Sequence, residues 1–421
     1  MRGTAVRLVA VPVPHRARDG HGSGEAGGPG AVGSRGSRLK GEGRTMGNAL
    51  QQLTALGQSV WYDNISRGAL RGELAALVTA GEVQGVTSNP TIFEKAISGG
   101  DDYDDDIRRL VAAGHRGQDV FWELAVSDIR AGADLLRPVF ERTEGADGYV
   151  SLEVSPDLAD DGPGTVAEAK RLFAKVSRPN VMIKIPASRE CWDAIEECTA
   201  LGLSINVTMM FAPSHYDAVA EAYIRGLERR AGRGQDLSVV ASVASVFVSR
   251  VDTLVDKRLA ELAAAGGQPT SLPSLLGKAA VANAKGIYAR FQERFNERDP
   301  RWRSLHAKGA RVQRPLWAST STKNPAYRDV MYVEELIGPD TVDTMPPATI
   351  TAFRDHGQAQ RTVDAGQADA RRVLKELAGL GIDMDSVGAT LQREGLMAFS
   401  QSFHQVLQVV EAKSKALTVS R

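Results

Sequence analysis

Eight short runs of β-branched and apolar residues alternate with helical patterns along most of this chain, and this alternation constrains its fold more than any other feature. The runs predict strands at 60–65, 85–89, 149–154, 181–185, 204–209, 239–247, 315–320 and 341–344. Strands that alternate with helices form a parallel sheet, and eight of them commonly close into a (β/α)8 barrel of the TIM type. A doubly wound open sheet is the alternative, but no glycine-rich phosphate-binding loop follows the first strand. We therefore predict an α/β protein with a (β/α)8 barrel.

Helix signals support this interpretation. Thr91 with Glu94, and Thr165 with Glu168, have the spacing of capping boxes that open helices. Pro213 stands where a first helical turn is expected. After the eighth strand, two further stretches have apolar residues on one helical face, which are Val373, Leu374, Leu377 and Leu380, then Phe399, Phe403, Val406 and Val410. We expect both to be additional terminal packing helices, which either cover the barrel or pack on a partner.

The first 45 residues differ in composition from the rest of the chain. From Arg16 to Thr45 the segment is rich in Gly and Arg and nearly lacks large apolar residues, so it cannot bury enough surface to order itself. One interpretation is a targeting peptide, but the segment has no clear cleavage pattern. Another is a nucleic-acid-binding arm, but the segment has no interleaved aromatic residues. The amphipathic sequence after Met46 looks like a natural start. We therefore predict that 1–45 is a disordered or dispensable extension and that 46–421 holds the barrel and its C-terminal helices.

Composition limits the classes of partner. Lys and Arg balance Asp and Glu at 51 each, which favours neither nucleic acid nor an anionic membrane as a partner. No apolar run approaches the roughly 20 residues of a membrane span. Cys191 and Cys198 are too far apart on one expected helix to form a disulfide with each other. Free cysteines of this kind are typical of a reducing compartment. We expect a cytoplasmic protein, as a monomer or a homodimer.

Lys184 interrupts the apolar segment Val-Met-Ile-Lys-Ile-Pro-Ala-Ser at 181–188. Lysine is among the residues least often buried, and burial disfavours its charged form. An uncharged lysine can attack a carbonyl and form a Schiff base. The alternative is a structural lysine whose amine reaches solvent.

Polar residues also gather near the predicted C-terminal strand ends, where the active sites of such barrels lie. They are Asp63, Asn89, Glu153, Asn206, Thr208, Ser245, Arg250 and Ser319. Each has an ordinary explanation on its own, such as capping a helix or pairing with a core cation. Burying all of them is costly without a purpose, so we predict an active site.

This set of side chains suits cleavage of a carbon–carbon bond in a ketose. A ketose carbonyl condenses with Lys184, and the resulting iminium withdraws electrons from the next carbon–carbon bond. Asp63 can take the proton from the hydroxyl on the departing side. Glu153 and Thr208 can hold a water that serves formation and hydrolysis of the imine.

The remaining polar residues are expected to bind the substrate. Sugar hydroxyls are expected to contact Asn89, Asn206 and Ser245. A phosphate is expected to be held by Arg250, Ser319 and Lys323. Because the iminium already serves as the electron sink that a Lewis acid would provide, we predict no metal. The histidines show no zinc-type spacing.

Four segments of the chain resemble motifs of the transaldolase family. They are Gly-Val-Thr-Ser-Asn-Pro-Thr at 85–91, Val-Met-Ile-Lys-Ile-Pro-Ala-Ser at 181–188, Asn-Val-Thr-Met-Met-Phe at 206–211 and Ala-Ser-Val-Phe-Val-Ser-Arg-Val-Asp at 244–252. The resemblance extends from residue 46 to residue 415. It implies a cofactor-free transferase of the pentose phosphate pathway. Such enzymes move a dihydroxyacetone unit from sedoheptulose 7-phosphate to glyceraldehyde 3-phosphate, giving erythrose 4-phosphate and fructose 6-phosphate.

The matching motifs also imply roles for individual residues. They imply that Lys184 is the Schiff-base lysine and that Asp63 is the acid–base aspartate. They also imply that Glu153 and Thr208 together hold the catalytic water. The implied substrate-binding groups are Asn89, Asn206 and Ser245, with Arg250 as the phosphate arginine. Some members carry Ser-x-Arg after strand seven, where this chain has Ala-Ser-Thr-Ser-Thr-Lys-Asn at 318–324. Lys323 is then the expected second phosphate charge, and a solvated loop lysine is the alternative.

Two other functions compete with transfer. An aldolase of the same superfamily releases free dihydroxyacetone and carries a tyrosine where Phe247 stands. Phenylalanine has no hydroxyl to hold the hydrolytic water, so Phe247 favours transfer to an acceptor. A catalytically inactive scaffold is the second alternative, but it would have no reason to keep a buried lysine beside two carboxylates.

Overall fold

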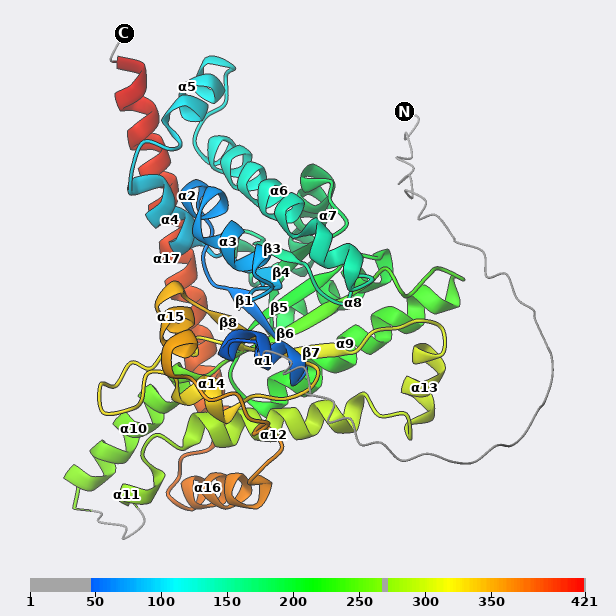
Figure 1. Cartoon of the computed structure of the whole chain (residues 1–421), viewed down its shortest axis with the longest axis vertical. Coiled ribbons are helices and arrows are strands. Elements are labelled where there is room, and N and C mark those ends of the chain that lie inside the picture. Colours follow the sequence, from blue (N-terminus) through cyan, green and yellow to red (C-terminus); the bar gives the residue numbers. More distant parts are fainter. Residues whose placement is uncertain (1–46, 267–271, 420–421) are drawn as a thin grey trace, which may run out of the picture. The chain divides into compact units, whose positions relative to one another are not determined.

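A computed structural model of the chain describes residues 47–266 and 272–419, and the predictions for 1–45 lie outside the described residues. The strands are β1 (Gln58–Tyr62), β2 (Gly85–Val86), β3 (Val150–Glu153), β4 (Val181–Pro186), β5 (Ile205–Met210), β6 (Ser242–Phe247), β7 (Gln313–Ala318) and β8 (Thr341–Met345). Each pairs in parallel with its neighbours in sequence order, and β8 pairs with β1. The barrel is therefore closed, as predicted, and all eight predicted strands are present, although several of their bounds differ from the prediction (Figure 1).

Helices surround this barrel. They are α1 (Ala49–Ala55), α2 (Arg67–Arg71), α3 (Glu73–Thr79), α4 (Pro90–Ser98), α5 (Asp104–Ala112), α6 (Gln118–Arg142), α7 (Gly162–Val176), α8 (Trp192–Leu201), α9 (Pro213–Gly232), α10 (Ser249–Ala264), α11 (Leu272–Leu275), α12 (Ala279–Arg294), α13 (Pro300–His306), α14 (Met331–Glu335), α15 (Pro347–His356), α16 (Gln367–Gly379) and α17 (Met384–Val419), with 3₁₀ turns η1 (Pro156–Leu158) and η2 (Arg189–Cys191). Within the described ranges, none of these helices is long and apolar enough to cross a membrane.

Two helix starts differ from the prediction. α4 begins at Pro90 with Asn89 as its N-cap, and the Asn89 side chain accepts a hydrogen bond from the Ile92 amide. α7 is capped in the same way by Asp161. The capping boxes predicted at Thr91 and Thr165 are therefore wrong, because a stronger Asn or Asp cap followed by proline in the first turn precedes each of them.

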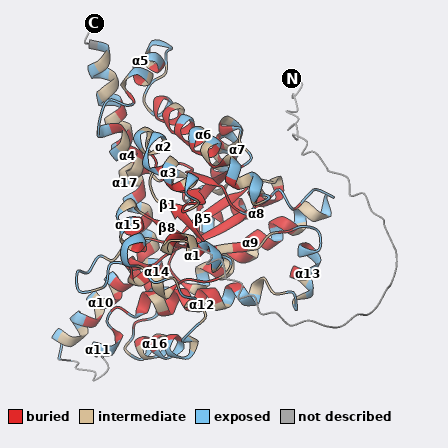
Figure 2. Cartoon of the chain, viewed as in Figure 1, coloured by how far each residue is buried: buried red, intermediate tan, exposed pale blue. Residues whose placement is uncertain are grey.

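The two terminal helices are present, and their predicted apolar faces pack inward. Val373 and Leu377 of α16 are buried, with Leu374 and Leu380 half-buried. On α17 the four predicted positions from Phe399 to Val410 are all buried. Figure 2 shows the strands as the most deeply buried elements. α17 contacts α4, α5, α6 and β5, so this C-terminal helix packs on the barrel beside the end of β5.

Candidate active site

A cavity of about 490 Å³ opens at the C-terminal ends of the strands. Its lining brings together residues that are far apart in the sequence, which are Asp63, Thr87, Asn89, Thr91, Ile92, Lys95, Lys184, Thr208, Ser245, Phe247, Arg250, Leu316, Ala318, Ser319, Ser321, Lys323, Thr344, Pro346 and Phe399. Nine of the predicted site residues are in this lining. The other two, Glu153 and Asn206, lie beside it on β3 and β5.

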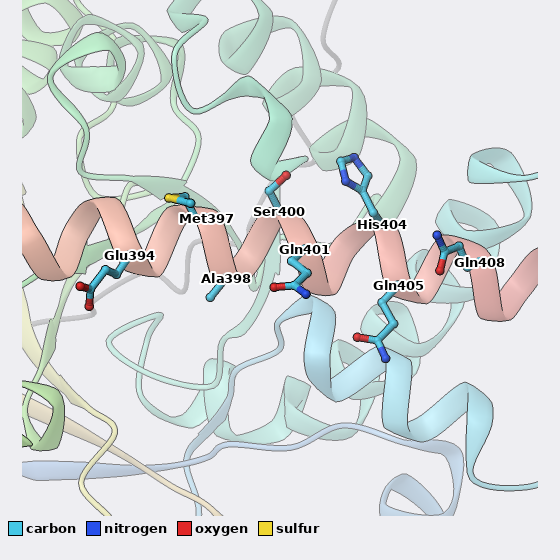
Figure 3. Close-up of a pocket in the computed structure, with 8 residues that line it drawn as sticks. All are labelled: Glu394, Met397, Ala398, Ser400, Gln401, His404, Gln405 and Gln408. Atoms are coloured by element: carbon cyan, nitrogen blue, oxygen red, sulfur yellow. The ribbon is translucent and has the colours of Figure 1, made fainter.

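A larger hollow, of about 930 Å³, lies elsewhere along the outer side of α17 (Figure 3). All of its lining side chains come from that one helix, and none of the predicted site residues is among them. It is the surface of a single exposed helix rather than a place where several strands converge. The smaller cavity is therefore the candidate site.

Strand register brings the central residues together. Glu153 of β3 pairs with Lys184 of β4, and Lys184 pairs with Asn206 of β5. Side chains at paired positions of neighbouring strands point to the same face of a sheet. Three polar side chains thus form one layer across the barrel.

The Lys184 side chain points into this layer and is only 5% exposed. Its Nζ donates a hydrogen bond to the Ser88 carbonyl at 3.0 Å and lies 3.5 Å from Glu153 Oε2. The ring of Phe399 lies on another side, with its centroid 5.9 Å from Nζ. The amine therefore faces the cavity and the acids rather than bulk water.

Two carboxyl groups are arranged around this amine. Burial raises the pKa of the Asp63 carboxyl, while the charges of Lys184 and Lys323 partly oppose the shift. Burial also raises the pKa of Glu153, against the charge of Lys184. Both acids are thus biased toward their protonated forms by loss of water and toward their ionised forms by the same lysine.

Two buried polar atoms in this layer remain open to a further partner. Glu153 Oε2 and Thr208 Oγ1 have no hydrogen-bond partner among the described residues. Thr208 lies within a bulge of β5, where the register shifts between Val207 and Met210 and Met209 has a φ of 65°. Strained backbone of this kind is concentrated at functional sites. A water or a substrate hydroxyl can both donate and accept a hydrogen bond, so either suits the Glu153 carboxylate oxygen and the Thr208 hydroxyl.

The three predicted hydroxyl-binding residues differ in their surroundings. Asn89 Oδ1 is engaged as the α4 cap at 3.0 Å, which was the structural alternative, but the residue also lines the cavity. Asn206 is fully buried, and its amide donates to Ser151 Oγ at 3.0 Å and accepts from Ser245 Oγ at 2.7 Å. Ser245 lines the cavity above it. Asn206 therefore holds Ser245 from beneath rather than lining the cavity itself.

Two cations stand on one side of the mouth. Arg250, at the start of α10, makes no ion pair with the described residues, and its guanidinium lies 5.8 Å from the centroid of the Phe247 ring. Burial lowers the pKa of Arg250, and Glu394 opposes this. Burial and Arg250 both lower the pKa of Lys323, so the two charges are close enough to interact. Two adjacent cations without a bound carboxylate suit an anionic group such as phosphate.

The loop after β7 completes this side. Ser319 adopts a φ of 58°, and its hydroxyl lies 2.9 Å from the Ser249 hydroxyl at the start of α10. Lys323 is exposed at the rim, where its Nζ donates to Ser321 Oγ at 2.7 Å. Lys323 thus lines the cavity and also has the solvent contact that the alternative interpretation required.

Sequence reasoning missed several lining residues. Thr87 and Thr344 lie just after β2 and within β8, and the rule that selected the other strand-end polar residues could have found them. Phe399 carried no such signal, because its helical spacing is also that of an ordinary packing residue. Among the residues that the structure describes, no group of three or more His, Cys, Asp or Glu side chains could hold a metal ion.

Comparison with known proteins identifies similar chains. Residues 60–410 match the family model described as Transaldolase/Fructose-6-phosphate aldolase. A protein named Transaldolase from Acidothermus cellulolyticus is 48% identical over 367 residues, which cover 87% of this chain and 96% of the relative. The Transaldolase of Frankia alni is 47% identical over 367 residues, 87% of this chain and 97% of the relative. The Transaldolase of Thermobifida fusca is 47% identical over 375 residues, 89% of this chain and 100% of the relative.

Proposed function

This chain belongs to the transaldolase/fructose-6-phosphate aldolase family, and on that premise we propose that its cavity carries out the transaldolase reaction through Lys184. The enzyme is a transferase that moves a dihydroxyacetone unit between sugar phosphates by Schiff-base chemistry. The donor is sedoheptulose 7-phosphate and the acceptor is glyceraldehyde 3-phosphate. The products are erythrose 4-phosphate and fructose 6-phosphate.

The reaction begins at the buried amine. Lys184 attacks the ketose carbonyl, and loss of water from the adduct gives an iminium. Glu153 and Thr208 hold the water that is lost and later returns, which the two open polar atoms on these side chains support. The carboxylate of Glu153 also shuttles the protons that this dehydration requires.

Cleavage then depends on a base on the other side of the substrate. Asp63 takes the proton from the hydroxyl of the departing fragment, the carbon–carbon bond breaks, and its electrons flow into the iminium to give an enamine. The aldose leaves, the enamine attacks the aldehyde of the acceptor, and Asp63 returns its proton to the new hydroxyl. Water then adds to the restored iminium, and the carbon–nitrogen bond breaks to free the ketose product and Lys184. Asn89 and Ser245 bind sugar hydroxyls during these steps, and Asn206 supports Ser245.

One observation carries the proposal, which is that a buried lysine amine and two carboxyl groups meet at the mouth of one closed barrel. The test combines fructose 6-phosphate with erythrose 4-phosphate and follows formation of sedoheptulose 7-phosphate. We expect rapid transfer, and little product from fructose 6-phosphate alone. Appreciable cleavage without an acceptor would favour the aldolase, which releases free dihydroxyacetone, and no turnover with either mixture would favour the scaffold.

Replacement of Glu153 by Gln is expected to slow the transfer reaction by roughly 10²- to 10⁴-fold, since the variant cannot shuttle protons to the bound water. The amide keeps the shape of the side chain, so folding is expected to be retained. Rapid mixing with borohydride measures the rate at which the Lys184 adduct forms. A variant that forms the adduct at the wild-type rate would remove Glu153 from this step.

Replacement of Arg250 by Met is expected to raise KM for fructose 6-phosphate about tenfold or more and to leave dihydroxyacetone transfer from unphosphorylated fructose unchanged. Lys323→Met is expected to act in the same direction with a smaller effect, because Lys323 is exposed at the rim. Steady-state kinetics with both donors separates the effects. Equal losses for the two donors would show that these cations do not bind the phosphate.

The proposal extends to the setting of the enzyme. Sugar phosphates are its substrates, and we propose that it meets them in the cytoplasm as a monomer or a homodimer. It uses no cofactor in this scheme, because the iminium withdraws the electrons. Residues 1–45 take no part in the chemistry and are proposed to be dispensable for it.

A further inference from the structure

α17 passes unusually close to the end of β5. A Cβ added at Gly388 would lie 2.6 Å from the Ala212 Cβ, and one added at Gly395 would lie 2.9 Å from the Met209 sulfur. Contacts under 3.0 Å essentially do not occur with real Cβ atoms, so a side chain at Gly388 would force α17 away from Ala212, whereas one at Gly395 would only displace the flexible Met209 side chain. The two glycines are seven residues apart, about two turns, and therefore share one face of the helix.

Polar contacts hold the same helix over neighbouring strand ends. Gln392 Nε2 donates to the Met209 carbonyl at 3.0 Å, at the bulge of β5. Ser400 donates to Asp157 in η1, which follows β3, at 2.9 Å. Ser402 accepts from Thr91 of α4, which follows β2, at 3.0 Å. α17 is thus fastened to the ends of strands that flank Lys184 on both sides.

Phe399 is one turn beyond Gly395 and is the residue of α17 that lines the cavity. It is 9% exposed, and its ring centroid lies 5.9 Å from Lys184 Nζ. The outer side of the helix is different in character, since Glu394, Gln401 and their neighbours line the exposed hollow there (Figure 3). The aromatic ring is therefore directed to the nucleophile by a helix whose other side is polar.

We propose that Phe399 excludes water from the intermediate on Lys184 and so commits the dihydroxyacetone unit to transfer rather than release. The inference rests on the proposed function and assigns a water-excluding role to a residue outside the barrel. Phe247 lines the cavity from β6, whereas Phe399 closes it from α17, so the two rings act on different sides of the site. Apolar groups that exclude water from an active site suppress hydrolysis of reactive intermediates.

The competing step is hydrolysis of the enamine. The enamine carbon takes up one proton to give the iminium, and water adds to the iminium carbon. The carbon–nitrogen bond then breaks, and the lysine amine and dihydroxyacetone separate. In sum one water is consumed and no oxidant or reductant is needed. This step requires water beside Lys184 after the aldose has left, which is the space that the Phe399 ring restricts.

The test is the ratio of dihydroxyacetone release to transfer in the Phe399→Ala variant of the full chain. With fructose 6-phosphate as donor and erythrose 4-phosphate as acceptor, we expect this ratio to rise about tenfold or more. Phe399→Leu restores most of the apolar volume, and we expect a ratio near that of the wild type. Val406→Ala is the matched control, because Val406 is fully buried on the same helix but does not line the cavity. It is expected to leave the ratio unchanged.

A merely structural role makes a different prediction. If Phe399 only anchors α17, then Phe399→Ala lowers release and transfer together and the ratio stays constant, which would overturn the inference. If Phe399→Ala does not fold, then Phe399→Val provides the same comparison with a smaller loss of volume, and a constant ratio there has the same meaning. Failure of the proposed function is distinct, since the wild type itself would then show neither transfer nor a lysine adduct.

Discussion

Replacement of Lys184 by Met is expected to reduce transfer activity by about 10⁴-fold or more, as removal of a covalent nucleophile does in other enzymes. The variant is expected to fold, because methionine fills a similar volume and leaves no polar group at this buried position. The variant loses the hydrogen bond from Lys184 to the Ser88 carbonyl, and Glu153 loses its ion-pair partner. No other group in the cavity supplies an amine at the same place.

Borohydride reduction in the presence of fructose 6-phosphate measures this directly. The wild type is expected to gain a stable adduct on the peptide that contains Lys184, and the variant is expected to gain none. Lys285→Met is the matched control. Lys285 is also buried, but it lies on α12, does not line the cavity, and forms an ion pair with Glu335 of α14 at 3.2 Å. A folded Lys184→Met protein with wild-type turnover would refute the mechanism.

The architecture could be predicted because each of its signals is local. Alternating strand and helix patterns fix the element order, and a parallel sheet of eight strands has few ways to cover both faces. Exact boundaries were harder to predict. The sequence predicts a strand over 85–89, but only Gly85–Val86 forms strand, since Asn89 leaves the sheet to cap α4.

The site could be predicted where a polar residue interrupts or ends an apolar strand, as for Lys184 and Glu153. Register alone then places neighbours together. Two features depend on tertiary contacts that no local pattern reports. Asn206 has the expected place in its strand, but its amide is occupied by Ser151 and Ser245. Phe399 belongs to a helix more than 200 residues after Lys184, and its spacing indicates only that it is buried.

Replacement of Asp63 by Asn is expected to slow carbon–carbon cleavage by roughly 10²- to 10⁴-fold, because an amide cannot accept the hydroxyl proton. Formation of the Schiff base does not need this base, so the borohydride adduct on Lys184 is expected to persist. The Asp63→Asn and Lys184→Met variants therefore separate formation of the Schiff base, which needs Lys184, from carbon–carbon cleavage, which needs Asp63. An Asp63→Asn protein that cleaves fructose 6-phosphate at the wild-type rate would assign the base to another residue.

The pH dependence gives this base a second signature. Burial raises the pKa of Asp63, so the carboxylate that acts as the base is lost as the pH falls through a value above the usual aspartate range. The activity of the wild type is expected to fall on that acid side. Glu153 also has a raised pKa and contributes to the same limb, so the profile of Glu153→Gln is compared with that of the wild type.

A third carboxyl group tests whether the acid limb belongs to Asp63. Asp343 of β8 is fully buried, its Oδ1 accepts a hydrogen bond from Thr320 at 2.8 Å, and burial raises its pKa to about 8. Its charge interacts with Asp63, so ionisation of Asp343 above that pH disfavours the Asp63 carboxylate. Asp343→Asn is therefore expected to alter the pH profile of kcat/KM near and above pH 8 and to leave the acid limb in place. A variant in which the acid limb disappears instead would show that Asp343, rather than Asp63, carries the proton that controls cleavage.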